Sequence, residues 1–214
     1  TTVGATDYYI LQQSIEGYNL ADLNWGSANA QTITLSFWVR SSLTGSFGVV
    51  LQNGNNNRSY PILYTISVAN TWEYKTITIA GDTSGTWFTT NGNGVQIRFD
   101  LGIGSTYRGT SGAWTGTSAI YGVTGATNFV STNGATFYIT GVQLEKGSTA
   151  TSFDYRPYGT ELALCQRYFW KSYNSSVVPG AAGINQAGSV MIYIPATGNT
   201  VRCTMPYKVN MRTA

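Results

Sequence analysis

The chain has 214 residues and a formal net charge of +3. Asp, Glu, Lys and Arg make up only 10% of it, against roughly 25% in ordinary globular proteins, whereas aromatic residues make up 14%. This composition excludes a disordered chain and a coiled coil, and no Lys/Arg run or long apolar stretch predicts a nucleic-acid or membrane partner. The many Thr, Tyr, Val and Ile residues favour an all-β protein, with Gly and Asn for its turns.

Short segments of alternating apolar and polar residues predict strands along most of the chain. The clearest is 32–41, TITLSFWVRS, in which an apolar face alternates with a face of Thr34, Ser36 and Trp38. Further strands are expected at 8–15, 47–52, 61–68, 72–79, 94–101 and 135–145, with shorter ones near 119–123 and 128–130. Turn signals separate these segments, and no helical periodicity occurs before residue 158. The spacing therefore predicts a β-sandwich or barrel rather than βαβ units.

The character of the sequence changes near residue 158. The segment 161–169, ELALCQRYF, predicts one short helix with Thr160 as its N-cap, and 189–195 with 200–211 predict a hairpin. We expect a sandwich over 1–158 and a C-terminal arm or small subdomain over 159–214. The arm is too short to bury a sufficient core alone, so Leu162, Leu164, Tyr168 and Phe169 should pack on the sandwich or on a neighbouring subunit. The missing initiator Met indicates a truncated or processed chain.

The residues needed for catalysis are scarce. Histidine is absent, which removes the commonest general base and metal ligand. Two cysteines, Cys165 and Cys203, cannot form a standard zinc site. The carboxylates are isolated in sequence, and Glu73 with Lys75 and Asp100 with Arg98 are expected to be solvent-facing pairs. The sequence therefore predicts no enzyme, no catalytic residue and no cofactor; a glycosidase, the alternative, would need two carboxylates in one cleft.

Calcium is the one metal for which the sequence offers ligands. Asp82 with Thr83, and the Asn53–Asn57 cluster, supply carboxylate, amide and hydroxyl oxygens of the kind that Ca²⁺ prefers. Neither segment has the carboxylate density of a dedicated calcium loop. A structural Ca²⁺ is a minor alternative to a chain without metal.

The tryptophans suggest a ligand site. Trp38 and Trp72 lie in predicted strands, whereas Trp25, Trp87 and Trp114 lie in loops rich in Gly and Thr. Aromatic rings beside amides and hydroxyls are typical of sugar sites, and loop side chains are not committed to a sandwich core. We expect Trp114 to form such a site with Tyr107 and Arg108, supported by Trp87 and Asp82. The alternative is that these rings plug the ends of the sandwich or form subunit contacts.

Four segments carry a resemblance to a known family. They are LSFWVRSSLTGSFGVVLQN (35–53), ANTWEYKTITIAGDTSGTW (69–87), IRFDLGIGST (97–106) and ATFYITGVQLEKGSTATSFDYRPYGTELALCQRYFWK (135–171). They resemble a module of bacteriophage tail-fibre and virion-surface proteins. The resemblance implies a jelly-roll sandwich like that of carbohydrate-binding modules, followed by a C-terminal extension, and it carries no catalytic motif.

The expected function follows from this resemblance and from the aromatic, weakly charged composition. We expect a non-enzymatic virion structural protein, on a tail fibre or another surface appendage, that binds host glycan and other virion proteins. The resemblance implies a homotrimer on the surface of the phage particle. Capsid decoration without a ligand is the first alternative, and a glycan-degrading enzyme is a less favoured one.

Overall fold

The computed structural model describes residues 2–171, 178, 209 and 211. The chain forms two compact units, Thr1–Asp154 and Tyr155–Ala214, which divide close to the boundary expected at residue 158. The predicted hairpin of 189–195 and 200–211 lies outside the described residues. None of the helices that are described is long and apolar enough to cross a membrane.

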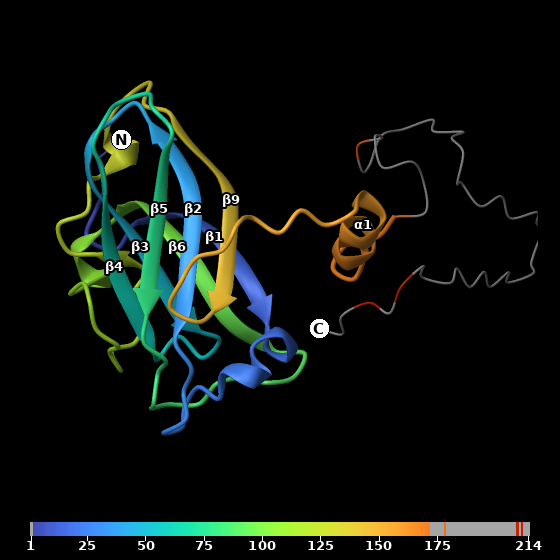
Figure 1. Cartoon of the computed structure of the whole chain (residues 1–214). Helices are drawn as coiled ribbons and strands as arrows, with labels where there is room; N and C mark the ends of the chain where they lie inside the picture. Colours follow the sequence, from blue (N-terminus) through green and yellow to red (C-terminus); the bar gives the residue numbers. More distant parts are fainter. Residues whose placement is uncertain (1, 172–177, 179–208, 210, 212–214) are drawn as a thin grey trace, which may run out of the picture. The chain divides into compact units, whose positions relative to one another are not determined.

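Two antiparallel sheets make up the first unit (Figure 1). The four-stranded sheet has the order β1 (Tyr8–Glu16), β6 (Asn93–Ile103), β3 (Gly45–Asn53) and β4 (Ser59–Ile66). The three-stranded sheet has the order β5 (Glu73–Ile79), β2 (Ile33–Ser41) and β9 (Phe137–Lys146). A short parallel pair, β7 (Arg108–Gly109) with β8 (Gly122–Val123), and the 3-10 helices η1 (Gly17–Asn19), η2 (Ala21–Leu23), η3 (Ser105–Tyr107) and η4 (Phe129–Ser131) complete it.

The connections make this sandwich a jelly roll. Among the long strands, only β3 and β4 follow each other within one sheet; every other connection crosses to the facing sheet. Strands that pair are therefore far apart in sequence, as β1 with β6 and β2 with β9 show. The expected all-β jelly-roll sandwich with a short C-terminal helix is confirmed.

The core lies between the two sheets and follows the period-two pattern. Ile33, Leu35, Phe37 and Val39 of β2 are at most 1% exposed. The Phe37 ring meets Phe99 of the opposite sheet edge-on, with a centroid distance of 5.2 Å. Burial of large aromatic and branched side chains from both sheets is the main source of stability in such a fold.

Each long predicted strand is confirmed with small shifts at its ends. Pro61 lies inside β4, where it is tolerated because β4 is the edge of its sheet. The predicted strand at 128–130 is wrong: the chain turns there into η4, in which Ser131 N donates to Asn128 O. Of the segment 119–123, only β8 is extended in a ladder.

The outer face of the four-stranded sheet is covered in part by the segment 104–127. A Cβ atom on Gly48 of β3 would lie only 2.8 Å from Val123 Cγ2 of this segment. Arg98 and Asp100 of β6 are 6% and 1% exposed as a result. The prediction that they form a solvent-facing pair is wrong, because the covering segment buries both, and burial raises the pKa of Asp100.

The described part of the second unit contains one helix, α1 (Tyr158–Gln166). It begins three residues before the predicted start, and Thr160 is not its N-cap, since the Pro157 carbonyl accepts from the backbone N–H groups of Thr160 and Glu161. No residue of α1 is buried within the structure described. The partner surface expected for Leu162, Leu164, Tyr168 and Phe169 stays a prediction.

Candidate functional site

One end of the three-stranded sheet presents four exposed aromatic side chains on its outer face. They are Trp38, Trp72, Tyr74 and Tyr138, which are between 42% and 47% exposed, and we call them the aromatic face. Two come from the adjacent strands β2 and β5, one from β9, and Trp72 directly precedes β5. Exposed aromatic side chains that cluster on a surface are a common feature of binding sites.

The strand register explains why these rings meet. Trp38 points away from the core because its neighbours Phe37 and Val39 point into it. Trp38 lies directly opposite Tyr74 of β5, and the two ring centroids are 5.2 Å apart. The register therefore fixes the spacing of the aromatic pair at the centre of the face.

A second aromatic pair extends the face. The rings of Trp72 and Tyr138 lie 6.4 Å apart, and the guanidinium of Arg40 stands 5.5 Å from the centroid of the Tyr138 ring. Arg40 lies opposite Tyr138 in the β2–β9 ladder. An aromatic surface with a cation and hydroxyl groups at its side can take both the C–H face and the hydroxyl groups of a sugar.

The rest of the same outer face is covered by the chain itself. After β9, the segment 147–154 folds back over the sheet: Thr34 Oγ1 donates to Gly147 O at 2.8 Å, and Asp154 N donates to Gln143 Oε1 at 2.8 Å. Thr34 and Ser36 are buried in consequence. The cover is partial, since Thr76 and Thr78 of β5 stay exposed on this face together with the aromatic residues at its other end.

A bulge in β9 shapes the middle of the aromatic face. The register shifts where Gly141 adopts a φ of +57°, a conformation that favours glycine. A Cβ atom there would lie 3.4 Å from Trp38 Cδ1 and 3.8 Å from Phe153 Cδ2. The Trp38 indole thus rests against the bulge, close to Phe153.

The strand β5 beneath Tyr74 is held by a carboxylate. Glu73 accepts hydrogen bonds from the backbone N–H groups of Ser67 and Val68 at 2.7 and 2.8 Å, and from Lys75 Nζ at 2.6 Å. These contacts lower the pKa of Glu73, and the hydrogen bond from Lys75 has the largest effect. The two side chains pair as expected but are only 15% and 18% exposed, so they support the strand rather than face solvent.

The loop tryptophans of the predicted site form a packed cluster. The rings of Trp25, Trp87 and Trp114 lie 4.6 to 5.5 Å from one another, and Trp114 Nε1 donates to Ala80 O at 2.7 Å. Trp25 and Trp87 are each 9% exposed, and Trp114 is half-buried. The expectation that loop position leaves a ring open to solvent is therefore wrong at Trp87, and the alternative of a packed plug describes the cluster.

Asp82 lies next to this cluster but is fully engaged. Its two carboxylate oxygens accept from Arg58, and Ser84 N also donates to Oδ1 at 3.1 Å. Asn53 Oδ1 accepts from the backbone of Asn57 and Arg58. With their oxygens used in this way and a guanidinium at the carboxylate, these residues do not fit a Ca²⁺ site. No group of three or more His, Cys, Asp or Glu side chains that could hold a metal occurs in the described part of the chain.

Tyr107 and Arg108 belong to other surroundings than Trp114. Tyr107 packs against Tyr121 at 5.0 Å and Tyr8 at 5.9 Å. The Arg108 guanidinium donates to Ile103 O and Val123 O at 2.7 and 2.6 Å and lies 3.9 Å from Asp100. The structure joins Trp87 to Trp114 but does not bring Tyr107 or Arg108 into their cluster, and ligand binding by these residues stays a prediction.

The sequence interpretation did not name any of the four residues of the aromatic face as candidate site residues. A signal was present, because Trp38 alternates with the core residues of its strand and so falls on the outer face. The pattern did not reveal which part of that face the chain later covers.

Comparisons with known proteins found no matching family model and no matching curated protein. The resemblance to phage virion-surface proteins thus stays a prediction. Among the solved structures that match this chain are two carbohydrate-binding domains. One is a CBM4 module, with 17% identity, a TM-score of 0.37, and coverage of 68% of this chain and 67% of that one. The other is the N-terminal cellulose-binding domain of Cellulomonas fimi β-1,4-glucanase C, with 17% identity, a TM-score of 0.29, and coverage of 69% and 76%.

Proposed function

We propose that the chain is a non-catalytic glycan-binding module and that it binds sugar on the aromatic face. The observation that carries this proposal is the exposure of Trp38 and Tyr74, whose rings are paired at 5.2 Å on the outer face of the three-stranded sheet. Sugar rings stack on such surfaces through their C–H groups, and each ring contributes about 1 kcal/mol beyond the area that it buries. Single-site affinity is therefore weak, and display on an oligomer would supply avidity.

The proposal also includes where the module is located, and this part depends only on the sequence resemblance to phage virion-surface proteins. On that basis it is a structural component of a phage tail fibre or surface appendage, a homotrimer that attaches to host glycan. Exposed aromatic residues are also enriched in subunit interfaces, which keeps capsid decoration as the alternative.

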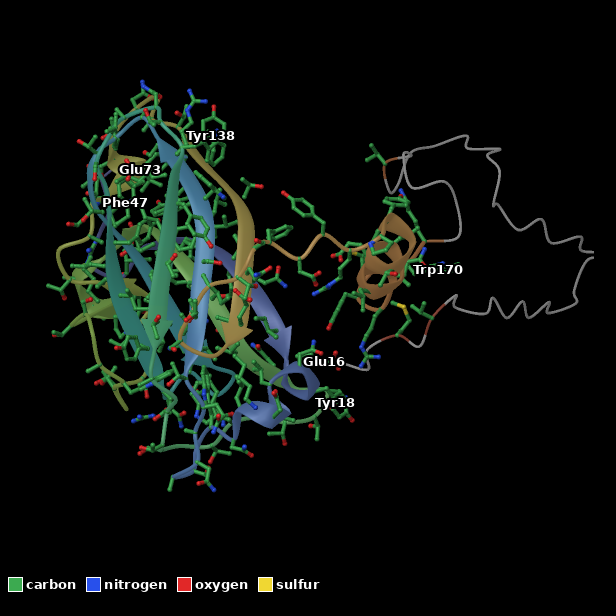
Figure 2. The ribbon with its side chains drawn as sticks, in the orientation of Figure 1. Glu16, Tyr18, Phe47, Glu73, Tyr138 and Trp170 are labelled. Carbon is green, nitrogen blue, oxygen red and sulfur yellow. The ribbon has the colours of Figure 1, made fainter. Side chains whose placement is uncertain are left out.

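The test uses the whole chain with Trp38→Ala and Tyr138→Ala in affinity electrophoresis against hydroxyethyl cellulose, xylan, mannan and bacterial surface polysaccharide. Each variant should lose about tenfold in affinity for whichever polymer retards the wild type. Tyr18→Ala is the matched control, since Tyr18 is 60% exposed and lies at the opposite end of the sandwich from Tyr138 (Figure 2).

In the electrophoresis, glycan binding at this face is refuted if no polymer retards the wild type, or if Trp38→Ala binds as the wild type does. Light scattering on the same proteins measures the oligomeric state and tests the decoration role. An oligomer that becomes a monomer in Trp38→Ala, with no glycan bound by either protein, would favour the decoration role.

A further inference from the structure

A buried arginine on the other sheet is surrounded by amides. Arg98 lies on the outer side of β6 and is 6% exposed. Its Nε donates to Gln12 Oε1 at 2.7 Å and its Nη2 to Asn56 Oδ1 at 3.2 Å, and the guanidinium also donates to the side-chain oxygens of Gln52 and Gln96. We call these five residues the Arg98 site. A guanidinium held by four acceptors is fixed in position.

The positive charge of the Arg98 site has no carboxylate beside it. No ion pair with Arg98 occurs among the residues described. Asp100, two residues along β6, accepts from Val123 N at 3.1 Å and lies 3.9 Å from Arg108. The nearest ring, Tyr121, stands 4.5 Å from the guanidinium. Burial without a counter-charge lowers the pKa of Arg98, and an anionic ligand would offset this cost.

The amides add hydrogen-bond donors to that charge. A guanidinium only donates, so each amide must turn its oxygen toward Arg98 and its NH₂ group away. Gln12 Nε2 donates to Ser14 Oγ at 3.3 Å and Gln52 Nε2 to Ser59 Oγ at 3.0 Å. The nitrogens of Gln96 and Asn56 donate to none of the described residues. A cation accompanied by unused N–H groups is complementary to an anion.

An exposed tyrosine, Tyr8, lies near the Arg98 site and contacts Tyr121, the ring that packs on the Arg98 guanidinium. Tyr8 is 54% exposed and its ring lies 5.3 Å from that of Tyr121. Gln12 and Ser14, which neighbour Arg98 and Gln96 in the β1–β6 ladder, are exposed as well. The site therefore combines an accessible aromatic ring with a fixed positive charge.

We infer that the Arg98 site binds a carboxylated sugar residue, with the carboxylate held by the charge of Arg98 and the free amide N–H groups, and the sugar ring at Tyr8. The inference extends the proposed glycan binding to a second site on the opposite sheet. It adds a charge-dependent selectivity for acidic glycans to the stacking proposed for the aromatic face.

The test compares carboxylated polysaccharides with their methyl esters, which keep the backbone and lose the charge. Polygalacturonate, alginate and hyaluronan serve as probes of the whole chain. The wild type should bind at least one acid form about tenfold or more tighter than its ester, the effect of a hydrogen bond to a charged group. Equal affinity for the acid and the ester of all three polymers would overturn the inference.

The decisive variant is Gln12→Glu, which places a carboxylate on Arg98 Nε without changing the shape of the side chain. It should abolish the preference for the acid form while the protein stays folded. The matched control is Gln13→Glu, which adds the same charge to the same strand, but on the opposite face, because Gln13 pairs with the core residue Ile97. A preference kept in Gln12→Glu, or lost equally in both variants, would refute the site. Trp38→Ala tests the aromatic face separately, so the two proposals can fail independently.

Discussion

The guanidinium of Arg58 binds both carboxylate oxygens of Asp82, with Nη2 to Oδ1 at 2.6 Å and Nε to Oδ2 at 2.7 Å. This pair joins the turn after β3 to the loop after β5, and its hydrogen bonds, with the charge of Asp82, raise the pKa of Arg58. Asp82 is 1% exposed. A buried carboxylate bound in two places by arginine is a structural clamp.

Asp82→Asn should destabilise the protein by about 1.5–3 kcal/mol, because it removes one partner of a largely buried charged hydrogen-bond pair. Urea unfolding followed by tryptophan fluorescence measures this loss. Asp22→Asn, which breaks the exposed pair of Asp22 and Lys146 at 3.2 Å, is the control and should change stability by less than about 0.5 kcal/mol. Chelation of Ca²⁺ should leave the wild-type midpoint unchanged; a drop would show that these residues hold the ion after all.

The stability lost when a tryptophan is replaced should depend on how tightly its ring is packed, and not on whether the residue lies in a strand or in a loop. Trp87→Ala should cost about 3–5 kcal/mol, since it opens a cavity in the cluster with Trp25 and Trp114. Trp72→Ala removes a ring that is 42% exposed and should cost less than about 1 kcal/mol. Chemical denaturation of the two variants side by side decides this, and similar losses would show that the cluster is not part of the core.

Acid should weaken the contribution of Glu73. Its pKa is lowered in the folded state, mainly by Lys75 and also by two backbone N–H groups. Between that lowered value and the ordinary value of 4.5 the unfolded chain binds more protons, so this contribution is complete above pH 4.5 and is lost as the pH falls through the folded pKa. The stability difference between the wild type and Glu73→Gln should therefore be largest near neutral pH and shrink on acidification. A difference that is constant from pH 7 to about 3 would contradict the lowered pKa.

The local pattern was sufficient to predict the long strands, but it did not predict the short ones correctly or show which sheet faces the chain covers. The alternation in 32–41 placed Phe37 inward and Trp38 outward, and both positions follow from the period of two. The burial of Thr34 depends on Gly147, far along the chain. Such long-range covering leaves no mark in the short window that predicts a strand.

The predicted site rested on a general rule about loops, and long-range contacts override that rule. Trp25 and Trp114 lie in separate loops, yet their rings are 5.4 Å apart. Nothing in the Gly- and Thr-rich surroundings of Trp114 indicates that partner. Likewise, the alternation in 94–101 identified Arg98 as facing away from the core, but the four amides that surround it come from β1, β3, the turn after β3 and its own strand.

The pairing of β2 with β9 has a consequence for synthesis on the ribosome. β2 (Ile33–Ser41) leaves the exit tunnel about 100 residues before β9 (Phe137–Lys146) is complete. At roughly 5–20 residues per second, the nascent chain waits about 5–20 s with one edge of β2 unpaired. During this interval the unpaired backbone edge of β2 and its apolar side chains, Ile33, Leu35, Phe37 and Val39, are accessible to other nascent chains. Chains that are being translated from the same messenger RNA can then associate through this strand. Slow, high-contact-order closure of this kind makes expression yield sensitive to temperature and to chaperone supply.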